Sequence, residues 1–447
     1  MSHPLLTAPI GRSLLRLAGP TTLVMVAQTF VAIAETYFFG RLGTEALAGF
    51  ALVFPLMMMM TMMAAGGIGG GVAAAMARAL GAGRREDAHA LVLHALAIGA
   101  GFALVFTTLA WTVAPGLYRL LGGSGASLAN AQTYSLVFFT GSAAVWANFI
   151  LSAILRGGGD AATPGRYMLI FSFVQVPLSG VLALGIGDWR GFGMAGPALS
   201  SIATAACAAF LQARALWRGK LGFQPALIGV PFQRRLFWDI LRVGLISSFS
   251  ALTANLTSML VTGLVGRFGV AALAGYGIGV RLEFMLVPLA FGIGSGLTTL
   301  VGVAAGADDW KRAVRAAWTG SLIAGGAIGL LGWIVALLPE TWARLFSYDR
   351  AVIAATVGYI TRVAPFYCLF GLGMTLSFAS QGAGRMVPPF IAGIARLIVA
   401  TAGGWIAVEI LGWDLHGVFT AIAAGMICFG ALITAPLIVR PWRARAV

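Results

Sequence analysis

Apolar side chains follow one another in long runs that short polar segments separate. A window of about 20 apolar residues forms an α-helix long enough to cross the hydrocarbon core of a bilayer. Windows of this kind predict twelve membrane-spanning helices, near residues 14–39, 47–77, 90–117, 130–155, 165–187, 194–216, 238–265, 272–304, 316–339, 351–379, 387–411 and 417–439. The pattern therefore predicts an all-α, polytopic membrane protein.

The composition agrees with this prediction. Of the 447 residues, 59% are hydrophobic and only 10% are charged, which leaves too few polar side chains to cover the surface of a water-soluble domain. The three cysteines fall in predicted spans at unrelated spacings, so the sequence indicates neither a disulfide framework nor a zinc site.

Most Lys and Arg residues lie in loops on the same side as the amino terminus. Cytoplasmic loops carry the excess of Lys and Arg, so we expect both termini in the cytoplasm of a multi-pass protein of the plasma membrane, the inner membrane in a bacterium. The net charge of +15 is spread over these short loops, which favours contact with the lipid bilayer and argues against a nucleic-acid partner.

The second half of the chain repeats the first. GRLGTEALAGF at 40–50 returns as GRFGVAALAGY at 266–276, an offset of 226 residues, and LRGGGDAATP at 155–164 corresponds to SQGAGRMVPP at 380–389, an offset of 225. Because an even number of predicted spans separates the copies, both halves cross the bilayer in the same direction. Parallel repeats of this kind are typical of secondary transporters, whose substrate site lies near mid-depth.

The repeat predicts two six-helix lobes. We expect the N-terminal lobe at 1–217 and the C-terminal lobe at 237–447, with residues 218–236 as a cytoplasmic linker that contains Gly, Pro and several cations.

An ordered set of short motifs resembles one transporter family. The set consists of Arg16 and Pro20 in the first predicted span, the stretch 35–43 in which an acid precedes Gly-Arg-Leu-Gly, the Gly-Ala-Gly at 81–83, the loop 156–164 and the Gly-Met-Ala-Gly at 193–196. Together they resemble the multidrug and toxic compound extrusion (MATE) transporters of the MOP flippase superfamily. The resemblance implies a monomeric secondary antiporter that exports small organic cations and drugs in exchange for H+ or Na+, by alternating access and without another cofactor.

Some positions depart from the family pattern. The family usually has Asp where this chain has Glu35. One subgroup has an Asn and an Asp before a Pro in the fifth helix, where this chain has Ser172 and Val176 before Pro177. Another subgroup has a Glu in the seventh helix, but residues 254–255 include no acid. The coupling residues of those subgroups therefore do not carry over.

Glu35 is an acid within the first predicted span. A carboxylate at membrane depth costs several kcal/mol unless it is paired, protonated or hydrated. Because burial disfavours the charged form, proton binding there can compete with cation binding. We therefore predict that Glu35 exchanges a proton or Na+ for a cationic drug. The alternative is a hydrated Glu without a role, near the outer end of the span.

Glu283, in the eighth span, is the second candidate for ion coupling or substrate binding. Arg281 is two residues away and points to a different side of the helix, so we expect the partner of Glu283 to be Arg362 or Arg396, the other cations within spans. One interpretation is a structural ion pair that stabilises the second lobe, and the other is a second coupling or substrate site.

Neutral polar and aromatic residues at membrane depth extend the candidate site. Aromatic faces and a carboxylate together suit organic cations, although hydrogen bonds between helices explain any single residue of this kind more often than a cavity does. The candidate lining residues are Gln28, Trp146, Asn148, Gln175, Asn255, Thr257, Tyr367 and Gln381. Pro20 lies on the helix of Glu35, and we predict a hinge there that transport by Pro20→Ala would test.

Other functions fit the sequence less well. Neither Lys220 nor Lys311 completes a phosphate-binding loop, which argues against an ATP-driven pump, and no HExxH or GxSxG motif indicates an enzyme. A flippase for lipid-linked oligosaccharide or another amphipathic lipid stays an alternative because of the three Arg within spans. A carboxylate-lined cavity would favour organic cations, and an Arg-lined cavity would favour anionic lipid head groups.

Overall fold

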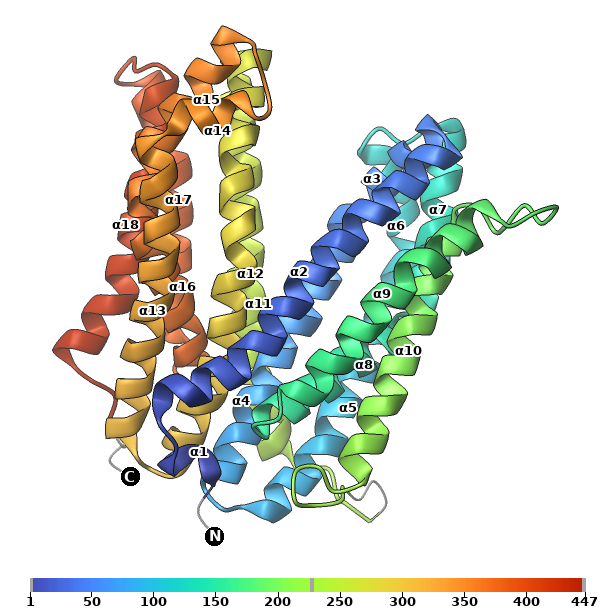
Figure 1. Cartoon of the computed structure of the whole chain (residues 1–447), viewed down its shortest axis with the longest axis vertical. Helices are drawn as coiled ribbons and strands as arrows, with labels where there is room; N and C mark the ends of the chain where they lie inside the picture. The colour runs from blue at the N-terminus through green and yellow to red at the C-terminus, as the bar shows by residue number, and fades with distance from the viewer. Residues whose placement is uncertain (1–2, 226–228, 444–447) are drawn as a thin grey trace. The chain divides into compact units, whose positions relative to one another are not determined.

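A computed structural model describes residues 3–225 and 229–443, and this part of the chain is almost entirely helical (Figure 1). The only pairing of extended backbone within it is a single bridge between Ile186 and Trp189. The helices are α1 Pro4–Thr7, α2 Ile10–Leu42, α3 Thr44–Met62, α4 Ile68–Gly81, α5 Arg85–Thr112, α6 Ala114–Leu120, α7 Gly125–Thr140, α8 Ser142–Gly157, α9 Ala162–Leu184, α10 Ala195–Trp217, α11 Arg234–Gly266, α12 Val270–Gly306, α13 Trp310–Leu337, α14 Pro339–Arg344, α15 Arg350–Val363, α16 Tyr367–Gly382, α17 Val387–Glu409 and α18 Leu415–Val439.

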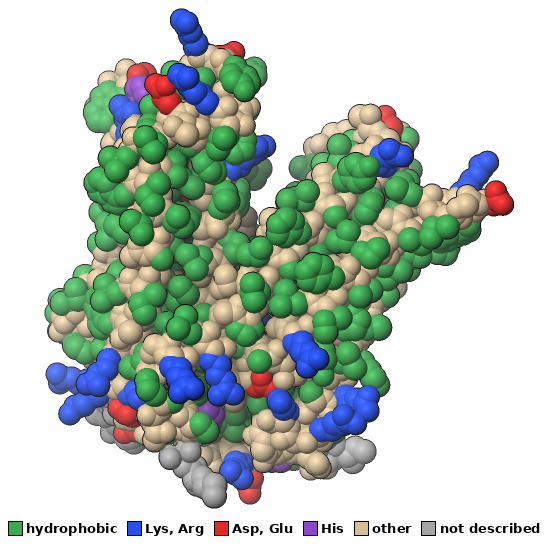
Figure 2. All heavy atoms as spheres, in the orientation of Figure 1, with side chains coloured by type: hydrophobic (Ala, Val, Ile, Leu, Met, Phe, Trp, Pro, Cys, Tyr) green, Lys and Arg blue, Asp and Glu red, His purple; other side chains and the backbone are tan. Residues whose placement is uncertain are grey.

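The predicted all-α membrane fold is confirmed. Within the described residues, 11 helices are long and apolar enough to cross a membrane, and α7 with α8, bent by 49°, form a further span if the two are counted as one. Side chains such as Leu104, Phe173 and Leu330 remain exposed on these helices. Figure 2 shows hydrophobic side chains over the sides of the long helices and Lys and Arg near their ends. This is the surface that a bilayer requires.

The chain forms two compact units. The N-terminal unit is Gly19–Gly244, and the C-terminal unit combines Met1–Ala18 with Leu245–Val447. The division falls within α2 and within α11, whereas the sequence suggests a linker at 218–236, of which residues 226–228 lie outside the described part of the chain.

Each unit contains the same close approach between its second and fourth spans. A Cβ added to Gly157 would lie 2.5 Å from the carbonyl oxygen of Ala73, and one added to Gly382 would lie 2.4 Å from that of Thr298. Both residues of the second pair follow their counterparts by 225 positions. Only Gly leaves room for backbones at this distance.

The fourth span of each half also breaks at the same position. In the N-terminal unit α7 ends and α8 begins around Gly141, where an added Cβ would meet Ile202 at 2.3 Å. In the C-terminal unit a short 3₁₀ turn, Ala364–Phe366, separates α15 from α16 and contains Pro365. At the second break, Pro365 cannot donate the helical hydrogen bond. At the first break, Gly141 allows close packing against the neighbouring helix. The two equivalent breaks therefore contain different residues.

Both ends of the described chain lie at one end of the C-terminal unit. Arg312, in the first turn of α13, donates hydrogen bonds to the carbonyl oxygens of Leu5 and Ala8, at 2.7 Å and 2.5 Å from Nη2. Arg385, between α16 and α17, donates to the carbonyl oxygen of Arg443 at 2.5 Å. The two ends of the described chain therefore lie at the same end of this unit, and the position of both termini in the cytoplasm stays a prediction.

Candidate functional site

Glu35, on α2, lies buried against α9 and α10 in the N-terminal unit. Its residue surface is only 6% exposed. The side-chain amide of Gln175 donates to Glu35 Oε1 at 2.9 Å, and the hydroxyl of Ser201 donates to the same oxygen at 3.3 Å. The carboxyl group is therefore neither hydrated in bulk solvent nor left without polar contacts, which is what a carboxyl group at membrane depth requires.

The surrounding groups determine how Gln175 is oriented. Its amide nitrogen donates to Ser201 Oγ at 2.9 Å as well as to Glu35, so the two N–H groups face the carboxylate and the hydroxyl. Ser200 Oγ donates to the backbone carbonyl of Gln175 at 3.1 Å. Among the described residues, both hydrogen bonds to Glu35 end on Oε1, which leaves Oε2 for a proton or a cation.

Aromatic rings stand one helical turn beyond Glu35. Phe39 stacks on Phe50 with ring centroids 4.3 Å apart and meets Tyr134 edge to face at 5.6 Å. The hydroxyl of Tyr134 donates to Met57 Sδ at 3.5 Å. The rings form an apolar, polarisable wall next to the acid.

The contact between α2 and α9 positions these groups. Gln28 Nε2 of α2 donates to Ser172 Oγ of α9 at 3.0 Å. Glu35, seven residues later on α2, contacts Gln175 of the same helix α9. Residues seven apart lie on similar faces of a helix. The two helices approach closely at Gly180, where an added Cβ would lie 2.8 Å from the ring of Phe38.

Pro20 lies inside α2, which continues through it without a break. A Cβ added to Gly165 of α9 would lie 2.6 Å from Pro20 Cβ, so the proline packs against α9 at this point. The hinge stays a prediction.

The second acid, Glu283, lies half-buried on α12 of the C-terminal unit. The hydroxyl of Tyr359 on α15 donates a hydrogen bond to its Oε1.

The expected ion pair to Glu283 is absent from the described residues. Arg396 instead places its guanidinium over the ring of Phe370, 4.7 Å from the centroid. Arg362 donates to the carbonyl oxygen of Gly358, one turn earlier on its own helix. Arg281 places its guanidinium over the ring of Phe346, 5.4 Å from the centroid. It therefore points away from Glu283, as expected for residues two positions apart on a helix. The three arginines thus contact aromatic rings or a backbone carbonyl oxygen and form no ion pair with Glu283 among the described residues.

Each acid stands beside an equivalent aromatic pair. Phe50 and Tyr134 meet at 5.4 Å and 79°, and Tyr276 and Tyr359 meet at 5.5 Å and 82°. The members of the second pair follow those of the first by 226 and 225 residues. Glu35 is on the first span of its half, however, whereas Glu283 is on the second span. The two halves therefore present a carboxyl group to the same aromatic frame from different helices.

Two other candidates in the N-terminal unit form packing contacts. Trp146 is fully buried and stacks on Phe102 with centroids 5.2 Å apart. Asn148 accepts a hydrogen bond of 2.7 Å from Gln212. Both residues therefore join α8 to its neighbours α5 and α10. Helix packing of this kind is the alternative to a role in lining a cavity.

The remaining candidates lie in the C-terminal unit. Gln381 donates to Ser247 at 2.8 Å and joins α16 to α11. Tyr367, at the start of α16, is fully buried. Thr257 and Asn255 each donate to the backbone of their own helix, the former buried and the latter exposed.

The sequence interpretation omitted Ser201, the second hydrogen-bond donor to Glu35. The signal is present in the sequence, since Ser200 and Ser201 stand side by side in an otherwise apolar segment. Hydroxyl groups in membrane helices are common, however, and only the packing of α10 against α9 shows which of them reaches the acid.

Comparison with known proteins identifies similar chains. The family model described as MatE matches residues 20–181 and 247–406. A probable multidrug resistance protein NorM of Thermotoga maritima is 26% identical over 98% of this chain and 94% of its own length. A FAD transporter of Shewanella oneidensis is 25% identical over 89% of this chain and 88% of its own.

A solved structure shares the fold. It is described as the outward-facing conformation of a multidrug resistance MATE family transporter of the MOP superfamily. Its TM-score is 0.86 at 24% sequence identity, and the match covers 98% of each chain. The residues matched by the family model and the fold agree with the MATE resemblance that the sequence motifs indicate.

Proposed function

Because the chain belongs to the MatE family of membrane transporters, we propose that it is a secondary active antiporter that exports organic cations in exchange for H+ or Na+. The buried carboxyl group of Glu35 is the observation that carries this proposal. Among the described residues, its hydrogen-bond donors are the neutral groups of Gln175 and Ser201, and no Lys or Arg forms an ion pair that neutralises it. A proton, Na+ or the cationic substrate must then do so during each cycle.

The exchange works because one acid cannot bind two cations at once. Oε1 is held by its two donors while Oε2 takes the coupling ion. An organic cation that reaches the site can lie against Phe39 and Phe50 while the charge of Glu35 attracts it. Binding of the drug therefore expels the ion, and binding of the ion expels the drug.

The concentration gradient of the coupling ion supplies the energy for this exchange. When one monovalent cation leaves for each one that enters, no net charge crosses the membrane, so the membrane potential does not contribute. A tenfold ratio of H+ or Na+ is worth about 1.4 kcal/mol and sustains up to a tenfold concentration ratio of substrate.

The exported cation crosses the plasma membrane, with both termini of the protein in the cytoplasm. The position of both chain ends at one end of the C-terminal unit supports the shared side, and the excess of Lys and Arg in the loops on that side supports the cytoplasm. A single chain carries the whole site at Glu35, which supports a monomer.

Replacement of Glu35 tests the proposal. Cells that express Glu35→Gln should lose the resistance to a cationic dye that the wild-type protein confers, since the amide binds neither H+ nor Na+ in place of the drug. Glu35→Asp keeps the carboxyl group and should retain part of the resistance. Wild-type resistance in the Gln variant, at equal protein in the membrane, would contradict the proposal.

A second candidate function is export of an anionic, phosphate-containing substrate, as by a flippase. The observation that favours it is the similarity to a protein named FAD transporter over 89% of this chain. Within the described residues, the hydrogen-bond donors to Glu35 include no guanidinium group, which favours a cationic substrate. Competition distinguishes the two: excess FAD should leave efflux of a cationic dye unchanged if the first candidate is correct.

A further inference from the structure

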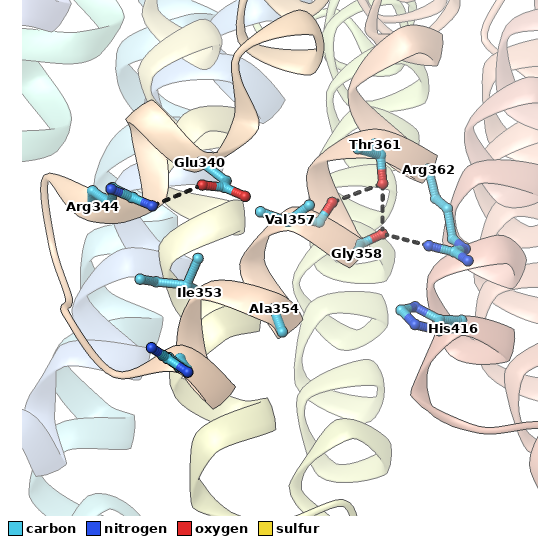
Figure 3. Close-up of a pocket in the computed structure, with 10 residues that line it drawn as sticks. Glu340, Arg344, Ile353, Ala354, Val357, Gly358, Thr361, Arg362 and His416 are labelled. Carbon is cyan, nitrogen blue, oxygen red and sulfur yellow. Dashed lines mark hydrogen bonds and ion pairs between the residues drawn. The ribbon is translucent and has the colours of Figure 1, made fainter.

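The C-terminal unit contains a pocket that the function of Glu35 does not involve. Its volume is about 500 Å³, and it follows one face of α15 between α14 and the first turn of α18. Figure 3 shows Arg344 towards one end and Arg362 with His416 towards the other, with Ile353, Ala354 and Val357 between them. We call this the arginine pocket; its other lining residues are Glu340, Arg350, Gly358 and Thr361.

The lining is strongly cationic. It carries three guanidinium groups and one carboxylate, an excess of two positive charges. Glu340 pairs with Arg344 at 3.0 Å, but both side chains are more than half exposed. An exposed ion pair one helical turn apart contributes little, so an anion can compete for Arg344.

The other two arginines have no acidic partner in the described part of the chain. Arg362 donates at 3.3 Å to the carbonyl of Gly358 on its own helix, which leaves most of its N–H groups unused. Arg350 begins α15, and none of the ion pairs among the described residues includes it. Two of the three guanidinium groups can therefore bind an anion without losing a salt bridge.

The spacing points to two anionic positions. Twelve residues separate Arg350 from Arg362, about 18 Å along a helix. The apolar surface of Ile353, Ala354 and Val357 fills the interval. A suitable ligand thus has an acidic group near each end of the pocket and a neutral part between them. The guanidinium fork matches phosphate oxygens in a bidentate arrangement, which makes phosphate the best fit.

Exposed apolar residues next to the pocket favour a position at the membrane interface, where lipid phosphates lie. Large apolar side chains on the neighbouring connections stay exposed, among them Leu338, Leu345, Tyr348 and Trp413. Aromatic and apolar residues beside cations are typical of the interface between hydrocarbon and water.

We propose that the arginine pocket binds phosphate groups, one at Arg344 and Arg350 and the other at Arg362. The ligand is either the phosphates of anionic lipid head groups or those of a soluble organic phosphate. This site differs from that of Glu35 in its charge and in the unit that carries it.

Two probes distinguish the sources, both applied to the purified full-length protein. In detergent, inorganic phosphate is titrated against chloride at equal ionic strength, with the unfolding temperature as the readout. In lipid nanodiscs, phosphatidylcholine alone is compared with phosphatidylcholine mixed with phosphatidylglycerol. A response to either probe that depends on the pocket supports the proposal and identifies the source.

The variants are Arg350→Gln, Arg362→Gln and the double variant, with Arg190→Gln as a matched control. Arg190 is an exposed arginine in the loop between α9 and α10 of the other unit. The double variant should weaken the apparent affinity for the active probe about tenfold or more, since each guanidinium supplies charge-assisted hydrogen bonds. The control should respond as wild type does.

The proposal is overturned if the double variant keeps the wild-type response to both probes, or if Arg190→Gln loses as much. Should the Gln variants fail to fold, Arg350→Lys and Arg362→Lys provide the test, because they keep the charge without the fork. Affinity reduced in these Lys variants supports the proposal, and wild-type affinity in them overturns it.

Discussion

At the scale of single residues, the two acids differ in how they are satisfied. Glu35 accepts hydrogen bonds from an amide and a hydroxyl, groups that keep their donors whether or not the acid is charged. Glu283 accepts a hydrogen bond from the phenol of Tyr359. The two acids therefore differ in the kind of group that donates to them, and ion exchange at Glu35 stays a prediction.

We expect Ser201→Ala to change ion binding at Glu35. The variant removes only the hydroxyl that donates to Glu35 Oε1, a hydrogen bond worth about 1 kcal/mol. The concentration of coupling ion that gives half-maximal transport should therefore change several-fold. Ser179→Ala is the control, because Ser179 is a buried serine of the same unit whose hydroxyl forms no hydrogen bond to Glu35 among the described residues. If transport by Ser201→Ala depends on the coupling-ion concentration as wild-type transport does, Ser201 does not contribute to ion binding at Glu35.

The repeat supplies a matched pair of tyrosines for stability. Tyr359→Phe should lower the free energy of unfolding by about 1–3 kcal/mol, because it leaves Glu283 without its hydrogen-bond donor. Tyr134→Phe, at the equivalent position, loses only a contact of 3.5 Å to sulfur and should cost less than about 1 kcal/mol. Denaturation of both variants in the same detergent tests this, and equal losses would show that the hydroxyl of Tyr359 has no special role.

At the scale of helices, close packing at glycine and breaks in the fourth span recur in both units. The glycines at 157 and 382 face backbone carbonyl oxygens that also correspond in the repeat. The breaks at 141 and 364–366 correspond too, although one contains Gly and the other Pro. Equivalent geometry therefore persists where the residues that produce it have changed.

Gly157→Ala should destabilise the protein by about 1–3 kcal/mol, because the added methyl group would lie 2.5 Å from a backbone oxygen that has little freedom to move. Gly101→Ala, on an exposed face of α5 with nothing within 4 Å, should be neutral or stabilise by up to about 1 kcal/mol. Thermal unfolding of the two variants measures the contrast. A Gly157→Ala protein as stable as Gly101→Ala would mean that α4 and α8 are not in close contact.

At the scale of the whole molecule, the sequence predicted the helices far better than the contacts among them. Membrane spans depend on local hydrophobicity, which can be summed along the chain, and the internal repeat checks the result. Contacts between polar side chains depend on how each helix is rotated. Gln28 and Gln175 were predicted only as candidate lining residues, and the structure shows that Gln28 contacts Ser172 of α9 and that Gln175 contacts Glu35. Ser201 was not predicted at all.

The partner of Glu283 shows why charge alone is a poor guide inside such a protein. Arg396 and Arg362 were the expected partners because they are the other cations within spans. A guanidinium can instead be satisfied by an aromatic face or a carbonyl oxygen, and both cases occur here. Complementary charge in the sequence therefore does not identify a pair when other acceptors are nearby.

The most direct test of the account measures transport by purified protein in proteoliposomes with an imposed gradient of H+ or of Na+. An organic cation should accumulate against its gradient with wild-type protein under one of the two gradients, and this coupled accumulation should disappear in Glu35→Gln. Wild-type accumulation in that variant, or accumulation by wild type without any ion gradient, would contradict ion exchange at Glu35.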